Sequence, residues 1–252
     1  NFLQDQSVRI KVNALYATKP YNPDFDKQIN ILLSDESASV RELCRHLLKT
    51  KGVNFSEIYR QRIKKEELLS GSLIGLSEVG TIDDLPIFEQ YISSNKSKII
   101  IGCLTAINKF NPDIAKHHSL ELFTHSIKRV RNKAAEILAK GCDIDTLQKI
   151  RQTYLAGDIE IKITILKLYN KIGGWNVIGD FLIALTDENS NIQNIGWQLL
   201  DKWKASATRL FTTPPKAEIE RANDIYKNLD KSKIKMTHSR TNLLQDLQFY
   251  LR

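Results

Sequence analysis

The sequence predicts an all-α fold, a right-handed superhelix of about six stacked helical hairpins closed by a helical C-terminal cap. Two observations lead to this prediction. One amphipathic helical pattern recurs about every 31 residues through most of the chain, and a shorter amphipathic segment precedes nearly every copy. The composition is that of a folded chain, with 252 residues, 42% of them hydrophobic, and only 11 Gly and 6 Pro.

The clearest copy of the pattern spans residues 130–141. Val130, Ala134 and Ile137 share one face at the three- and four-residue spacing of an α-helix, and Gly141 supplies a C-terminal stop. Equivalent helices recur at intervals of 29 to 32 residues, and their opening core residues are Val8, Val40, Leu69, Ile99, Val130, Ile161 and Ile192. The residues four and seven positions after each opening are mostly apolar and are expected to form the core between repeats.

Shorter leading helices are expected at residues 25–33, 55–65, 84–92, 114–125, 145–155 and 177–185. Each leading helix and the repeat helix after it form a helical hairpin, because turn and capping residues separate them. The helix at Val8 has no leading helix before it, and the sequence starts at Asn1. We therefore expect further residues upstream.

The period breaks after Lys204, and a proline-containing stretch at 212–215 follows. Helices are expected at 217–229 and 241–251, the second with Thr241 as its N-cap. We divide the chain into a repeat region, residues 1–204, and a C-terminal cap, residues 205–252, packed on the last repeat within the same domain. Four leucines would cover the open end of the repeats: Leu243, Leu244, Leu247 and Leu251. A docking tail for another domain is the alternative.

Two repeat openings resemble the HEAT repeat family. The run 35–44 has Asp five residues before Val40-Arg41, and Val130-Arg131 is followed by a small residue at the same spacing. The resemblance covers roughly residues 1 to 204 and implies an α-solenoid, with Arg131 in a ladder of Asp–Arg pairs along the turn edge. The family includes scaffolds, transport receptors, lyases and a few enzymes, so it does not specify a function. The pattern departs at Ser70, Gly71 and Ile100, where we expect apolar packing instead of the ladder.

The net charge of +8 and a pI near 9.3 indicate attraction to an acidic partner, whether protein, nucleic acid or anionic lipid. No apolar run is long enough to span a membrane. Cys44, Cys103 and Cys142 lie far apart and lack metal-ligand or redox spacing, which favours a reducing, cytoplasmic compartment. Cys44 and Cys103 fall in a core column and are expected to be buried thiols.

The most regular polar column lies ten residues after the opening of four successive repeats. It contains Lys109, Lys140, Lys171 and Lys202, and Lys133 and Lys167 are expected nearby from earlier turns of the same helices. Because the second helices of HEAT-like folds line a concave face, the resemblance implies that these six lysines form a binding stripe there. The competing explanation is that a lysine in a last turn stabilises its own helix through the dipole.

We expect a non-enzymatic scaffold whose basic concave face binds an acidic protein segment, with no cofactor. The alternative is nucleic-acid binding. HEAT-like alkylpurine DNA glycosylases place tryptophan and a catalytic aspartate on a basic concave face, and Trp197 followed by Asp201 is superficially similar. Trp197 falls in an apolar column, however, which favours packing. The sequence does not specify an oligomeric state.

One leading helix carries His118, Glu121 and His125 at three- and four-residue offsets, a spacing that metal sites use. HEAT-like deoxyhypusine hydroxylases use His-Glu dipeptides in several repeats, and this sequence contains none. Because the sequence identifies no fourth ligand, we interpret these residues as a polar helix face and predict no metal site.

Overall fold

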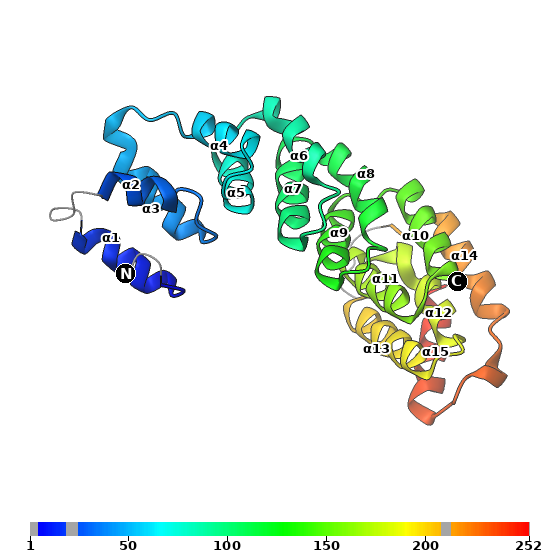
Figure 1. Cartoon of the computed structure of the whole chain (residues 1–252). Coiled ribbons are helices and arrows are strands. Elements are labelled where there is room, and N and C mark those ends of the chain that lie inside the picture. The colour runs from blue at the N-terminus through cyan, green and yellow to red at the C-terminus, as the bar shows by residue number, and fades with distance from the viewer. Residues whose placement is uncertain (1–4, 19–24, 208–212, 252) are drawn as a thin grey trace. The chain divides into compact units, whose positions relative to one another are not determined.

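The computed structural model of the chain describes residues 5–18, 25–207 and 213–251. Over these residues the chain forms fifteen α-helices, α1 to α15, several of them linked by short 3-10 turns, and no β-strand (Figure 1). The prediction of an all-α fold is confirmed. The chain divides into two compact units, Asn1–His118 and Ser119–Arg252, with the boundary inside α8.

In the first unit, each of the first three leading helices packs on the repeat helix that follows it. Helices α1 (Val8–Thr18) and α2 (Phe25–Leu32) contact α3 (Ala38–Leu48). Helix α5 (Leu69–Val79) contacts both α4 (Phe55–Lys64) and α7 (Ser97–Phe110), and α7 contacts α6 (Leu85–Tyr91). Helix α8 (Pro112–Leu122) follows.

In the second unit, the repeat helices contact one another in chain order. They are α9 (Lys128–Lys140), α11 (Ile159–Ile172) and α13 (Ser190–Ala207). Helix α10 (Ile144–Ala156) contacts α11, and α12 (Ile178–Leu185) contacts α13. The two remaining helices lie against this last pair, α14 (Lys216–Lys227) on α12 and α15 (His238–Tyr250) on α13.

Every predicted helix is present, and most boundaries differ from the prediction by one to three residues. Helix α13 continues to Ala207, past the predicted repeat boundary at Lys204. The N-cap of α15 is Thr237, whose hydroxyl accepts the backbone N–H of Arg240 at 3.3 Å. Thr241 lies one turn inside the helix and donates to the Thr237 carbonyl at 3.0 Å, so the predicted Thr241 cap was wrong. Thr212, at the start of the predicted breaker, lies outside the described residues.

Most residues of the predicted core columns are buried. The members with at most 7% exposure are Leu15, Cys44, Leu73, Leu76, Cys103, Ala106, Ala134, Ile137, Ile165 and Leu168. The four leucines of α15 and its C-terminal end are buried as expected, with Leu247 2% exposed. Val8 is 41% exposed, and Val12, Leu47 and Leu199 are only half-buried.

Gly71 accounts for one departure from the HEAT-like pattern. A Cβ at this position would lie 1.7 Å from the carbonyl oxygen of Ser34, in the turn after α2. Next to it, the hydroxyls of Ser34 and Ser72 lie 2.9 Å apart. Helix α5 therefore approaches this turn too closely for a side chain at position 71, and close backbone contact replaces the arginine of other repeats.

Candidate binding surface

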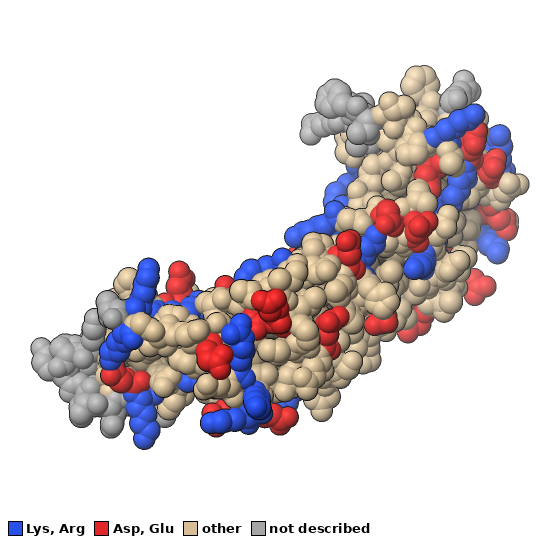
Figure 2. All heavy atoms as spheres, turned by 90° about the horizontal axis from the view of Figure 1, so that it is seen from above, with Lys and Arg blue, Asp and Glu red and all other residues tan. Residues whose placement is uncertain are grey.

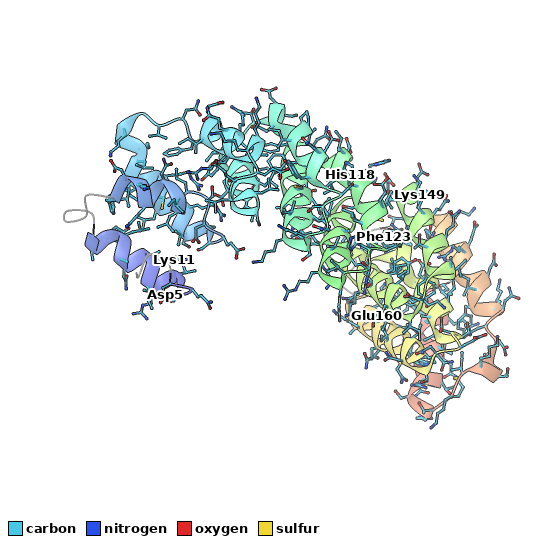
Figure 3. The ribbon with its side chains drawn as sticks, viewed as in Figure 1. Asp5, Lys11, His118, Phe123, Lys149 and Glu160 are labelled. Atoms are coloured by element: carbon cyan, nitrogen blue, oxygen red, sulfur yellow. The ribbon has the colours of Figure 1, made fainter. Side chains whose placement is uncertain are left out.

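Two buried arginines donate hydrogen bonds to the turn that precedes their own repeat helix. Arg131 donates from Nη1 to both carbonyl oxygens of residues 125–126 at 2.9 Å. Through Nη2 it pairs at 3.1 Å with Glu160, which is labelled in Figure 3. Arg41 donates to a carbonyl of its own turn at 2.6 Å and bonds Glu78 through Nε at 3.2 Å. Their side chains are 7% and 2% exposed, so these arginines stabilise the repeats and are closed to a binding partner.

Two aspartates that precede repeat helices pair with lysine. Asp35 and Asp187 each lie five residues before a repeat opening and accept the backbone N–H two residues on, at 2.8 and 2.9 Å. Lys11 of α1 pairs with Asp35 at 2.5 Å, and Lys162 of α11 pairs with Asp187 at 2.7 Å. The expected Asp–Arg pairing was therefore wrong in its partners, because each of these aspartates receives a lysine from the repeat helix before it.

Of the six predicted site lysines, Lys109 belongs to the first unit. Its ammonium donates to the carbonyl oxygens of Ser77 and Glu78 at 2.7 and 3.3 Å and lies 5.0 Å from the centre of the Phe110 ring. Both carbonyls belong to the last turn of α5. Lys109 therefore caps the C-terminal end of a neighbouring helix, which is a structural role.

Lys133 and Lys140, on α9 in the second unit, share one weak ionic partner. Their ammonium groups lie 3.6 and 4.0 Å from Oε1 of Glu136, and the Lys140 side chain is 73% exposed. Lys140 also borders a hollow of about 620 Å³ at the C-terminal ends of α9 and α11, whose lining includes Trp175 and Pro215. Lys140 is thus accessible, whereas Lys133 is partly buried.

Lys167, Lys171 and Lys202 are exposed, and none of them has a partner among the residues that the structure describes. They lie on α11 and α13, which contact each other. Lys202 is five residues from the end of α13, so the helix dipole does not explain its position.

Most of the net charge belongs to the second unit. Residues 119–252 contain 21 Lys and Arg and 15 Asp and Glu, whereas residues 1–118 contain 16 and 14. The face shown in Figure 2 carries acidic side chains interspersed with basic ones. The exposed lysines of the second unit are the candidate for a local basic surface.

A buried charge cluster that we did not predict joins three helices of the second unit. Arg151 of α10 bonds Asp180 of α12 through Nε at 3.0 Å and Glu218 of α14 through Nη2 at 2.7 Å, and Arg221 reaches Asp180 at 2.7 Å. The carboxylates are 3% and 7% exposed. Burial lowers the pKa of Arg151, but hydrogen bonds to Glu218 and Asp180 outweigh it and raise that pKa. Because both arginines of the cluster are paired with buried carboxylates, they do not contribute to the basic surface.

The tryptophans pack within the second unit. Trp197 is 5% exposed, and the Arg240 guanidinium lies 5.0 Å from its ring centre. Trp203 donates from Nε1 to a backbone carbonyl at 2.8 Å and meets Trp175 edge to face at 5.5 Å. The prediction that Trp197 packs is confirmed, and its burial leaves no open indole face for a nucleobase beside Asp201.

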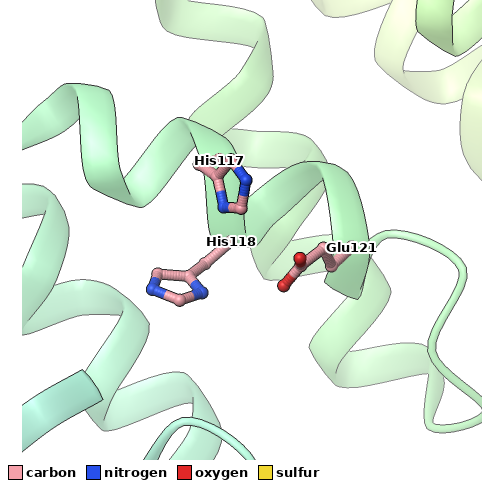
Figure 4. A group of neighbouring side chains, drawn as sticks. All are labelled: His117, His118 and Glu121. Atoms are coloured by element: carbon pink, nitrogen blue, oxygen red, sulfur yellow. The ribbon is translucent and has the colours of Figure 1, made fainter.

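The histidines of α8 group differently from the prediction. His125 lies beyond the end of the helix, and its Nδ1 accepts the backbone N–H of Ile127 at 3.0 Å. Ligand atoms of His117, His118 and Glu121 instead lie within 4.8 Å of one another (Figure 4). The sequence interpretation missed His117, because adjacent residues do not share a helix face.

None of the three cysteines, all of which the structure describes, forms a disulfide. Burial raises the pKa of the Cys44 and Cys103 thiols to about 12, as expected for core residues. Among the described residues, no helix combines the length and apolarity that crossing a bilayer requires. The chain matches no known protein family, and no curated protein matches its sequence.

Proposed function

We propose that this protein is a non-enzymatic interaction scaffold of HEAT-like type and that the exposed lysines of its second unit bind an acidic protein segment. In this proposal, the hairpins from α1 to α13 stack as a right-handed superhelix, the repeat helices line its concave face, and α14 and α15 form its C-terminal cap. The family assignment rests on the motif around Val40-Arg41 and Val130-Arg131.

The observation that carries the proposal is the contrast between two classes of lysine. Lys11 and Lys162 are committed to aspartates inside their own units. Lys167, Lys171 and Lys202 are exposed on contacting helices and have no partner among the described residues. A segment rich in carboxylates would supply the opposite charge that the second unit itself does not provide.

The hollow beside Lys140 favours an extended peptide segment as the partner. Its volume of about 620 Å³ can hold a few side chains, and its lining brings a cation, Lys140, together with an aromatic ring, Trp175. One apolar residue of the segment would enter the hollow while neighbouring carboxylates meet the lysines.

The test is binding of a fluorescein-labelled peptide of alternating Glu and Ala around one central Leu, measured by anisotropy. We expect saturable binding that weakens with salt and is lost in the variant Lys140→Glu/Lys171→Glu/Lys202→Glu. The matched control is Lys27→Glu/Lys64→Glu/Lys96→Glu, which makes the same charge change at exposed lysines of the first unit and should retain binding. An equal loss of peptide binding in both variants would mean that net charge alone determines binding, and it would refute the proposed surface.

Nucleic-acid binding is the other outcome of this experiment. A 20-base-pair duplex titrated under the same conditions should bind more weakly than the peptide at about 0.15 M salt. Tighter binding of the duplex, with a steep salt slope and loss in the same triple variant, would replace the acidic protein partner with nucleic acid.

The cytoplasmic location proposed with this function rests on the thiols. Cys44 and Cys103 are fully buried, and Cys142 is partly exposed without a disulfide, as expected for a chain kept in a reducing compartment.

A further inference from the structure

We propose that α8 carries a binding site for a first-row transition-metal ion such as Zn²⁺, formed by His117, His118 and Glu121. One ligand atom of each residue lies within 4.8 Å of the others, and Figure 4 shows the two imidazole rings and the carboxylate grouped on this helix. The site is independent of the proposed lysine surface, which lies on α9, α11 and α13.

A single helix sets the mutual positions of the three ligands. Glu121 follows His117 by four residues and His118 by three, and side chains at both spacings meet on a helix surface. The ring centres of His117 and His118 lie 5.8 Å apart with their planes at 85°. The edge of one imidazole is therefore turned toward the other, although the residues are adjacent in sequence.

The distances require a small adjustment on metal binding. Zn²⁺ holds nitrogen and oxygen ligands at about 2.0–2.2 Å, so two atoms on one tetrahedral ion lie roughly 3.3 Å apart. Because the separations are at most 4.8 Å, each must close by no more than roughly 1.5 Å. His117 and Glu121 are exposed, so rotation of their side chains can close this distance without moving the backbone.

Helix α6 places a carboxylate beside His118, one of the three proposed ligands. Oε1 of Glu89 lies 3.6 Å from Nε2 of His118, within the first unit. A carboxylate beside a metal-binding imidazole orients the ring and increases its basicity, as in other zinc sites. Glu89 lies 29 residues before His118, in the preceding leading helix, and was missed by the search for ligands on one helix.

The ligand set defines the class of ion. Two imidazoles and one carboxylate suit Zn²⁺, Ni²⁺ and Cu²⁺, whereas Mg²⁺ and Ca²⁺ prefer oxygen ligands alone. Three protein ligands leave at least one position of a tetrahedral ion for water.

The test is calorimetric titration of the full chain with ZnCl₂ in a buffer that does not bind metal. We expect one saturable Zn²⁺ per chain and no saturable binding of MgCl₂. Binding should weaken at least tenfold in His117→Ala and in His118→Ala and should disappear in the double variant. Far-UV circular dichroism of each variant verifies that the helices are retained.

The matched control is His46→Ala/His238→Ala, which removes two exposed histidines elsewhere and should leave the Zn²⁺ titration unchanged. Replacing Zn²⁺ with Co²⁺ should give visible absorption without a thiolate charge-transfer band, since the proposed site contains no cysteine. The proposal is overturned if the native chain shows no saturable site, if the double variant binds as the native chain does, or if the thiolate band appears.

Discussion

Removing Arg151 should destabilise the second unit more than any exposed ion pair can. The variant Arg151→Met keeps a long side chain but leaves Asp180 and Glu218, which are 3% and 7% exposed, without the guanidinium that bonds both. The lost contacts include a 2.8 Å bond to the Asn176 carbonyl. The substitution therefore removes the Arg151 hydrogen bonds of two buried carboxylates and one carbonyl where α10, α12 and α14 meet.

The expected loss is about 3 kcal/mol in the free energy of unfolding. Breaking a buried ion pair from one side costs about 3–5 kcal/mol, because the remaining charge stays desolvated. The lower end applies here, since Arg221 still bonds Asp180 at 2.7 Å and lies 3.7 Å from Glu218. Lys204→Met is the control, because Lys204 and its partner Asp246 are 38% and 50% exposed, and such pairs contribute about 0–1 kcal/mol.

Tryptophan fluorescence in a urea titration isolates the relevant unit. All three tryptophans of the chain, Trp175, Trp197 and Trp203, lie in the second unit, whereas circular dichroism reports helices of both units. We expect the fluorescence transition of Arg151→Met to move to lower urea and that of Lys204→Met to stay close to the native one. A loss below about 1 kcal/mol for Arg151→Met, or equal shifts for both variants, would refute the argument.

Four further predictions concern Gly71, Arg131 and the cysteines, and all but the thiol modification use the same unfolding transitions. Gly71→Ala places a carbon 1.7 Å from a carbonyl oxygen and should cost the first unit about 1–3 kcal/mol by circular dichroism, without shifting tryptophan fluorescence. Gly141→Ala is the control, since a Cβ at position 141 meets nothing within 4 Å. If Gly71→Ala lowers the free energy of unfolding no more than Gly141→Ala does, the close contact of Gly71 with Ser34 is contradicted. Arg131→Met removes two turn hydrogen bonds at 2.9 Å and should cost the second unit about 2 kcal/mol; a loss under about 0.5 would mean that the turn holds without it. In the native chain an aromatic disulfide reagent should modify Cys142 quickly. The buried thiols of Cys44 and Cys103, with a pKa of about 12, should react only after unfolding. Equal reaction rates for all three thiols would contradict this prediction. Thiols of the unfolded chain lose their protons from about pH 8.5, whereas the folded Cys44 and Cys103 thiols keep theirs until about pH 12. The folded state is therefore destabilised as the pH rises through this range, and the urea midpoint should fall. The midpoint should fall less in Cys44→Ala/Cys103→Ala, which lacks both thiols.

The helices could be predicted because each repeat buries the same kind of apolar face. Leu73, Ala134 and Ile165 occupy one column and are all buried, as the spacing required. The start of α15 was misplaced because Thr237 and Thr241 both precede apolar residues at helical spacing. The deciding contact is tertiary: Arg240 in the first turn bonds Asn194 of α13 at 3.1 Å, and a local pattern cannot show it.

The repeat period also predicts polar contacts between successive leading helices. Arg151 and Asp180 are 29 residues apart, and so are Glu89 and His118. Each pair joins successive leading helices near the repeat spacing, so a comparison of polar columns on the leading helices would have indicated both. Glu218 could not be found in this way, because α14 lies outside the period.

The lysine column shows why period alone does not define a binding site. Lys109 and Lys171 occupy equivalent positions on α7 and α11, each of which contacts the repeat helix before it. In the first unit, Lys109 reaches the last carbonyls of α5 and caps it. In the second unit, Lys171 has no partner among the described residues, and a hollow of about 620 Å³ lies at the ends of α9 and α11. The same column thus provides a helix cap in the first unit and an exposed lysine without a described partner in the second unit, where the proposed acidic segment would bind.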